Sequence, residues 1–256
     1  MNRQAQAGVL FLLGVAVLHA GTTDLYLRYV KAGLRPLLLA AGVVLIVTAA
    51  ATLWYERRAA REASQKAESA SPERDEEPDT DAHGHAAHRE PRIAWLLVLP
   101  LFALILVAPP ALGSYSAMRT GTALQEPWGY PKLPAAGPLR LNVVDYAGRA
   151  VYDHGRTLRG REVKLTGFLA LDHSGAPYLV RMALNCCAAD AQPVKIGLSG
   201  RIPPVLQPDT WLEVTGTYTP HRTKDPVNGG TIPYLNITQA NPVPVPHDPY
   251  DESWNN

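Results

Sequence analysis

Hydrophobic residues are distributed unevenly along the 256-residue chain, and three long stretches carry almost no charge. The first extends from Ala7 to Val30, the second from Pro36 to Tyr55 and the third from Ile93 to Gly113. A helix needs about 20 apolar residues to cross the roughly 30 Å of hydrocarbon in a bilayer. The pattern therefore predicts three transmembrane helices, two within residues 1–55 and one at residues 93–113.

Period-two alternation of apolar and polar residues takes over in the C-terminal half. It predicts five short strands, at residues 162–169, 177–184, 193–198, 211–218 and 232–238. A short helix is expected before them at Asn142–Asp153, with Asn142 as its N-cap. Gly167 and Gly216 lie inside two of the strands, where glycine often marks a bulge or a barrel corner.

These elements predict an α+β protein in which transmembrane helices precede a small, partly open five-stranded barrel of the OB type. The barrel is assigned to residues 141–240. Proline-rich segments flank it: residues 114–140 are expected to form a linker and residues 241–256 an extended tail.

Residues 56–92, between the second and third apolar stretches, are acidic and have few large apolar side chains. They cannot bury a core, so a disordered linker is predicted after Pro72. Glu56–Glu68 suits a charged extension of the second helix. Three histidines lie close together in this linker and could ligate Zn²⁺ or a similar ion through imidazole nitrogens. They are His83, His85 and His88.

Positive charges near the predicted spans indicate the orientation, because cytoplasmic loops carry an excess of lysine and arginine. The N-terminal tail and residues 56–92 together carry eight such residues, against five on the opposite side. The sequence therefore predicts a multi-pass protein of the plasma membrane. Its N-terminus is expected to be cytoplasmic and its C-terminal domain extracytoplasmic.

His19 and Asp24 are ionisable residues within the first apolar stretch. Such groups are costly at membrane depth and often functional, so both are candidate intramembrane sites. They are five residues apart, which places them on different faces of a helix. The favoured interpretation is that Asp24 lies near the outer interface and that local hydrogen bonds satisfy His19.

The only two cysteines, Cys186 and Cys187, are adjacent, and Asp190 follows them. Consecutive Cα atoms lie about 3.8 Å apart, whereas disulfides usually require about 4.4–6.8 Å. Three interpretations stay open. The three residues could ligate Zn²⁺ or Cu(I), the thiols could form a redox switch, or both cysteines could be small buried residues beside a turn that Asp190 caps.

The metal interpretation requires the segment to turn, because adjacent residues on a strand point to opposite faces. It also requires further ligands, and three residues are candidates by elimination: His154, Asp172 and His173.

Other functional classes lack support in the sequence. The net charge is +1, and no stripe of interleaved aromatic and basic residues is present, so a nucleic-acid partner is not expected. The chain has no Gly-x-Ser-x-Gly, His-Glu-x-x-His or nucleotide-binding loop. We therefore do not expect an enzyme.

Several motifs resemble the UPF0703 family of bacterial membrane proteins, which have a C-terminal DUF1980 domain. The most specific is the run from Cys186 to Ala191. Arg181, Gly167-Phe168, Asp209-Thr210-Trp211 and Pro233-Tyr234-Leu235 also match. The resemblance implies an accessory subunit paired with a separate multi-span permease. From the chemistry of the cysteine pair, we expect its extracytoplasmic domain to bind a metal ion such as zinc, or another small ligand. The alternative is a membrane-anchored binding or thiol-redox domain without a transport role.

Overall fold

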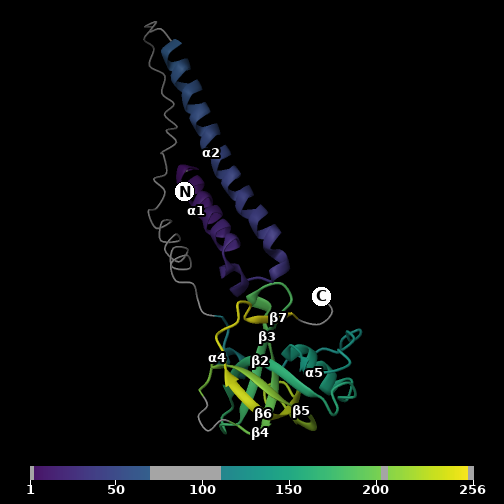
Figure 1. Ribbon diagram of the computed structural model, residues 1–256. Coiled ribbons are helices and arrows are strands. Elements are labelled where there is room, and N and C mark those ends of the chain that lie inside the picture. The colour runs from purple at the N-terminus through teal and green to yellow at the C-terminus, as the bar shows by residue number, and fades with distance from the viewer. Residues whose placement is uncertain (1–2, 70–110, 203–206, 253–256) are drawn as a thin grey trace. The chain divides into compact units, whose positions relative to one another are not determined.

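The computed structural model describes residues 3–69, 111–202 and 207–252. These residues form two compact units (Figure 1). The helices α1 (Arg3–Thr22) and α2 (Arg35–Ser69) form one unit. Residues 24–34, which connect the two helices, belong to the other unit together with the C-terminal domain.

Both helices of the first unit are long and apolar enough to cross a membrane. The part of α2 before Glu56 would extend about 30 Å, and the rest of α2 is the charged extension predicted from the sequence. The third predicted span, at residues 93–113, falls outside the described residues except for Ala111–Gly113, which are not helical. The predicted histidine site at residues 83–88 also lies outside them.

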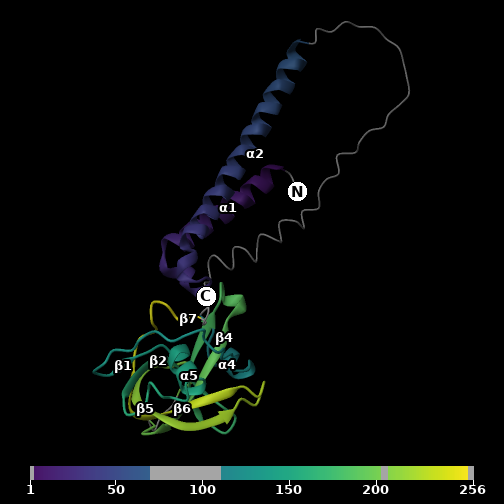
Figure 2. The same ribbon diagram turned by 90° about the vertical axis from the view of Figure 1, so that its right-hand side faces the viewer.

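Small residues line the contact between α1 and α2, which lie side by side (Figure 2). A Cβ on Gly14 would lie 2.6 Å from Ile46 Cγ1, so only glycine permits this approach. Buried small residues recur every seven positions, at Ala7, Gly14 and Gly21 on α1 and at Gly42 and Ala49 on α2. Large apolar side chains such as Phe11, Leu37 and Val44 are exposed instead. This distribution is typical of helices that pack through small residues within lipid.

The first helix ends at Thr22, so the prediction that it continues to Val30 is wrong. The hydroxyls of Thr22 and Thr23 donate back to the carbonyl of His19, and such local bonds compete with helix propagation. Two short 3₁₀ helices follow, η1 (Asp24–Arg28) and η2 (Ala32–Leu34). His19 therefore lies in the last turn of α1, and Asp24 lies in η1 outside that helix.

Five strands form the barrel of the second unit: β2 (Glu162–Leu171), β3 (Pro177–Leu184), β4 (Gln192–Gly200), β5 (Trp211–Lys224) and β6 (Thr231–Pro242). Their pairing closes a ring in the order β2-β3-β4-β6-β5. All neighbours are antiparallel except β4 and β6, which are parallel. The α+β class and the five predicted strands are confirmed. The barrel is closed, however, whereas a partly open one was expected.

Two glycines shape this ring, as the sequence indicated. At Gly167 β2 approaches β3 so closely that a Cβ would lie 2.8 Å from the carbonyl oxygen of Val180. From Phe168 onward β2 pairs with β3, after pairing with β5 up to that residue. Gly216 lies at a shift in register between β5 and β6. Each glycine therefore lies where the sheet bends.

The predicted helix before the barrel is α5 (Val143–Val151), and the side chain of its N-cap, Asn142, accepts a hydrogen bond from the Asp145 backbone nitrogen at 2.6 Å. Its apolar face covers the barrel core: Tyr146 and Ala147 share one buried cluster with Leu165 and Ile196. The Tyr146 hydroxyl also donates to the Tyr234 carbonyl at 2.7 Å.

Parts of the expected linker and tail are ordered elements of the barrel unit. The linker contains α4 (Ser114–Arg119) and β1 (Leu139–Arg140), which pairs with β2. Thr122 is held by a buried ion pair, because its backbone nitrogen donates to Asp225, which also accepts from Lys195 at 2.8 Å. The tail contains β7 (Tyr250–Glu252), which runs parallel to β3.

Candidate metal centre

The two cysteines lie on a tight loop that joins β3 to β4. Cys187 is extended, and a single 3₁₀ turn, η4 (Ala188–Asp190), follows it directly. The Asp190 backbone nitrogen donates to the Cys187 carbonyl at 3.1 Å and closes this turn. The segment therefore turns, as binding of one ion by both thiols requires.

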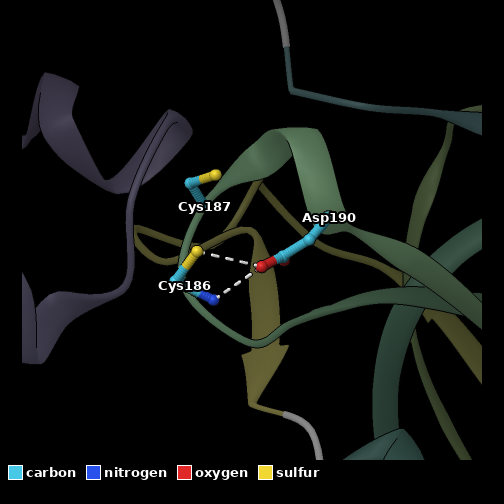
Figure 3. Close-up of side chains that lie close together, drawn as sticks. All are labelled: Cys186, Cys187 and Asp190. Carbon is cyan, nitrogen blue, oxygen red and sulfur yellow. Dashed lines mark hydrogen bonds between the residues drawn. The ribbon is translucent and has the colours of Figure 1, made fainter.

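The Asp190 carboxylate holds the loop together from inside. Oδ1 accepts from the Asn185 backbone nitrogen at 3.0 Å, and Oδ2 accepts from the Cys186 nitrogen at 2.9 Å. Oδ2 also accepts from the Cys186 thiol, with Sγ at 3.1 Å (Figure 3). Asp190 thus closes the turn and at the same time contacts a soft donor atom.

Three potential ligand atoms meet at this loop: the two sulfurs and one oxygen of Asp190 lie within 4.8 Å of one another. Among the described residues, no other group of three histidine, cysteine or acidic side chains comes together in this way. Cys186 is exposed, Cys187 is half-buried, and neither forms a disulfide. A cavity of about 20 Å³ beside Asp190 has room for one water molecule. Neither cysteine lines this cavity, so the loop itself offers two thiolates and one carboxylate, three of the four ligands that Zn²⁺ takes.

The electrostatics of the loop oppose a free thiolate. The hydrogen bond to Asp190 and then that with Cys187 are the main causes that raise the pKa of Cys186 from 9.0 to about 11. Partial burial acts to raise the pKa of Asp190, but the bonds from Cys186 and the loop backbone outweigh it and lower that pKa. At neutral pH the loop therefore pairs a protonated Cys186 thiol with a carboxylate anion.

The additional ligands considered from the sequence do not join this group. Asp172 and His173 follow β2 and lie at the opposite end of β3, whose eight residues span about 25 Å. The Asp172 carboxylate is occupied within its own turn, where it accepts from Ser174 and Ala176. His154 lies in a left-handed turn after α5, and its carbonyl accepts from Tyr218.

The connection between α1 and α2 pairs with the cysteine loop. Val30 and Cys187 form an antiparallel bridge. The Ala188 nitrogen donates to the Tyr29 carbonyl at 2.7 Å, and the Lys31 nitrogen donates to the Cys186 carbonyl at 3.1 Å. This contact could not be predicted from the sequence, because residues 24–30 resemble the end of an apolar helix. The site is thereby joined through the backbone to the segment between the two candidate spans.

Comparison with known proteins identifies the domain that carries this loop. Residues 132–251 match the family model of the DUF1980 C-terminal domain. The chain carries a DUF1980 domain. This match confirms the family expected from the cysteine run, and it extends from the segment before β1 into β7. No curated protein and no solved structure matches the chain.

The DUF1980 domain therefore includes the complete barrel, α5 and all three potential metal ligands. His19 and Asp24, the candidate intramembrane residues, both lie outside the matched residues. Asp24 has a partner in the C-terminal tail. Its carboxylate lies 2.6 Å from His247 Nε2, and both side chains are largely exposed.

Proposed function

We propose that this protein is a membrane-anchored accessory subunit of a multi-span permease, and that its DUF1980 domain binds a thiophilic metal ion. Cys186, Cys187 and Asp190 would supply the ligands. The observation that carries this proposal is the convergence of two sulfurs and a carboxylate oxygen within 4.8 Å on one loop. Thiolate ligands favour Zn²⁺ or Cu(I) over Mg²⁺ or Ca²⁺.

Metal binding at this loop is coupled to proton release. An ion would displace the proton of the Cys186 thiol to solvent, and the sulfur would bind it as a thiolate. The Asp190 oxygen that accepts the hydrogen bond from this thiol would then be available as a ligand. The hydrogen bond to Asp190 is the main cause that raises the pKa of the free thiol, and the negative charge of the same carboxylate attracts a cation.

A thiol-redox domain is the second candidate function. It is favoured by the two free thiols, of which Cys186 is exposed and Cys187 is half-buried. The thiolate is the reactive species in disulfide exchange, and reactive cysteines usually have a lowered pKa. The pKa of Cys186 is raised instead. Metal binding is therefore the better-supported of the two functions.

The barrel would serve as the binding module of the subunit. We infer an OB-type barrel from its strand order, because β4 and β6, the third and fifth barrel strands along the chain, pair in parallel. An OB barrel is a scaffold with many functions, so the proposed ligand comes from the loop chemistry alone.

The pairing of residues 24–34 with the cysteine loop supports one orientation in the membrane. Since this connection and the barrel form one compact unit, they lie on the same side. If α2 crosses the membrane, the chain would have to cross once more to reach that side, and the span predicted at residues 93–113 would supply this crossing. The excess of positive charge in the N-terminal tail and residues 56–92 favours an extracytoplasmic barrel.

Transport itself would require a partner. The two helices contact each other through small residues and expose apolar side chains, so they enclose no polar pathway. Affinity purification of the full chain from membranes tests this part. A multi-span protein is expected to co-purify, and its consistent absence would remove the subunit interpretation.

The metal content of the purified full chain tests the ligand assignment. The wild type is expected to retain zinc or copper after dialysis, and the Cys186→Ser/Cys187→Ser variant is expected to lose it. Equal content in both would refute the assignment. A membrane-impermeant thiol reagent should label intact cells, whereas labelling only after lysis would reverse the proposed orientation.

A further inference from the structure

A larger cleft lies elsewhere on the barrel unit and has a volume of about 540 Å³. Among the described residues, its walls come from η1, from residues 111–113, from the barrel strands β2 and β5, and from the tail before β7. Neither cysteine nor Asp190 lines it. Its size falls within the range typical of sites for small organic ligands.

Most of the charged groups in this cleft already have partners. Asp209 accepts from the Ser114 backbone nitrogen at 2.6 Å and from its hydroxyl at 2.9 Å. Asp24 is paired with His247. Among the described residues, the exposed guanidinium of Arg28 makes no hydrogen bond or ion pair and acts on the Tyr250 hydroxyl only through its charge. The partners of Asp209 are neutral, so its negative charge remains, and the cleft also holds one guanidinium without an acidic partner that can bind an anionic group.

The rest of the lining is largely apolar. The rings of Phe168 and Trp211 pack edge to face, with centroids 5.8 Å apart. Leu25 and Leu112 add aliphatic surface beside them. Phe168 and Trp211 are almost fully buried, so a ligand would gain apolar burial mainly from Leu112 and from the exposed side chain of Val245, in addition to the charge of Arg28. Apolar surface and a single free cation together select an amphipathic anion.

We propose that this cleft binds an amphipathic organic anion, with a phosphate or carboxylate head on Arg28 and an apolar body against Leu112 and Val245. Two sources share this chemistry: an anionic membrane lipid and a soluble small molecule. The lipid source is suggested by chain continuity, because Arg28 lies only six residues after the end of α1. This proposal is independent of the metal site.

Titration of the full chain in neutral detergent with hexyl phosphate, followed by calorimetry, tests the ligand chemistry. Hexyl phosphate is expected to bind more tightly than inorganic phosphate. Arg28→Gln should weaken its binding about tenfold, because a charge-assisted hydrogen bond is lost. The backbone carbonyl of Arg28, which accepts from the Tyr250 hydroxyl, is unchanged by this substitution, so folding should be preserved.

Arg159→Gln is the matched control, since Arg159 is exposed and lies outside the cleft. It should leave the affinity for hexyl phosphate unchanged. Leu112→Asn should reduce the advantage of hexyl phosphate over inorganic phosphate. If hexyl phosphate fails to bind, or binds equally to wild type and Arg28→Gln, the proposal is overturned.

Native mass spectrometry distinguishes the two sources. The chain would be reconstituted in nanodiscs of phosphatidylcholine with or without phosphatidylglycerol and then released. Retention of phosphatidylglycerol by the wild type but not by Arg28→Gln would identify the membrane lipid. Binding of hexyl phosphate without retained phosphatidylglycerol would support the proposal with a soluble ligand.

Discussion

The two loops at the ends of β3 are closed in the same way but differ in their chemistry. Before β3, Asp172 accepts from the Ser174 backbone nitrogen at 2.8 Å and from its hydroxyl at 2.7 Å. After β3, Asp190 accepts from the Cys186 backbone nitrogen at 2.9 Å and from its thiol, with Sγ at 3.1 Å. In each loop one carboxylate binds both the backbone and the side chain of a single residue.

This likeness shows that the aspartate bonds alone do not define a binding site. In both loops, hydrogen bonds overcome the effect of partial burial and lower the pKa of the aspartate. Only the second loop combines the carboxylate with two sulfur atoms, and only there does the connection between α1 and α2 pair with the loop backbone. The soft donors, not the turn that holds them, carry the proposed function.

Removal of the carboxylate charge should show the largest difference between the two loops, because only Asp190 contacts a thiol. Asp190→Asn replaces the anionic acceptor of the Cys186 thiol by a weaker, neutral one and should lower the pKa of Cys186 from about 11 toward 9.0. The thiolate fraction at neutral pH would then rise roughly tenfold to a hundredfold. Alkylation of the full chain by iodoacetamide as a function of pH measures this change. Asp172→Asn is the control and should leave the alkylation profile unchanged; an equal change in both variants would contradict the account.

Metal affinity should depend on pH because the ion competes with the thiol proton. Cys186 is protonated at neutral pH, so each proton released on binding makes the affinity rise about tenfold per pH unit. Competition with a chromophoric chelator between about pH 6 and pH 8 measures the slope. Ser174→Cys places one thiol beside Asp172 without a second sulfur, and this change should add no further tight site. A pH-independent affinity would show that Cys186 is not a ligand.

Loss of either carboxylate should destabilise the barrel by a similar amount. Asp172→Ala and Asp190→Ala should each lower the free energy of unfolding by about 1 kcal/mol, since both side chains are close to solvent. The pKa of each folded carboxyl lies below 3.8, so its contribution is complete above that pH and is lost as the pH falls through the lowered pKa. Thermal unfolding of the full chain in detergent at several pH values tests both the size and the sign. If the difference in stability between the wild type and either variant increased as the pH falls, this prediction would be contradicted.

The smallest effect concerns the side-chain donors. Ser174→Ala should cost about 0.5 kcal/mol, and Cys186→Ala should cost less, because a thiol is the weaker donor. Melting temperatures of the two variants, measured without added metal, provide the comparison. A larger loss for Cys186→Ala would mean that the thiol is primarily structural.

Local patterns in the sequence were sufficient for much of the fold. Alternating residues located the five barrel strands, and Asn142 marked the start of α5 through a contact only three residues long. Gly167 and Gly216 indicated where the sheet bends, because their position within strands is itself a local signal. The cysteines with Asp190 could also be named in advance, since all three lie within one turn.

The contacts that the sequence did not reveal join residues far apart in the chain. Arg181 donates to Asp251 at 2.9 Å, and Asp251 also accepts from the first turn of α5, so the tail closes the barrel unit. Val30 pairs with Cys187 although an apolar helix was expected there. Neither contact follows from periodicity or turn chemistry, because each depends on which surfaces the folded barrel leaves available.

X-ray absorption at the zinc edge of the zinc-loaded full chain tests the central claim most directly. We predict a shell with two sulfur ligands that is completed by oxygen. We also predict that the Cys186→Ser/Cys187→Ser variant remains folded but does not bind zinc tightly. A shell composed only of nitrogen and oxygen would assign the metal to another site, such as the histidines at residues 83–88. That result, or equal zinc in the serine variant, would contradict the account.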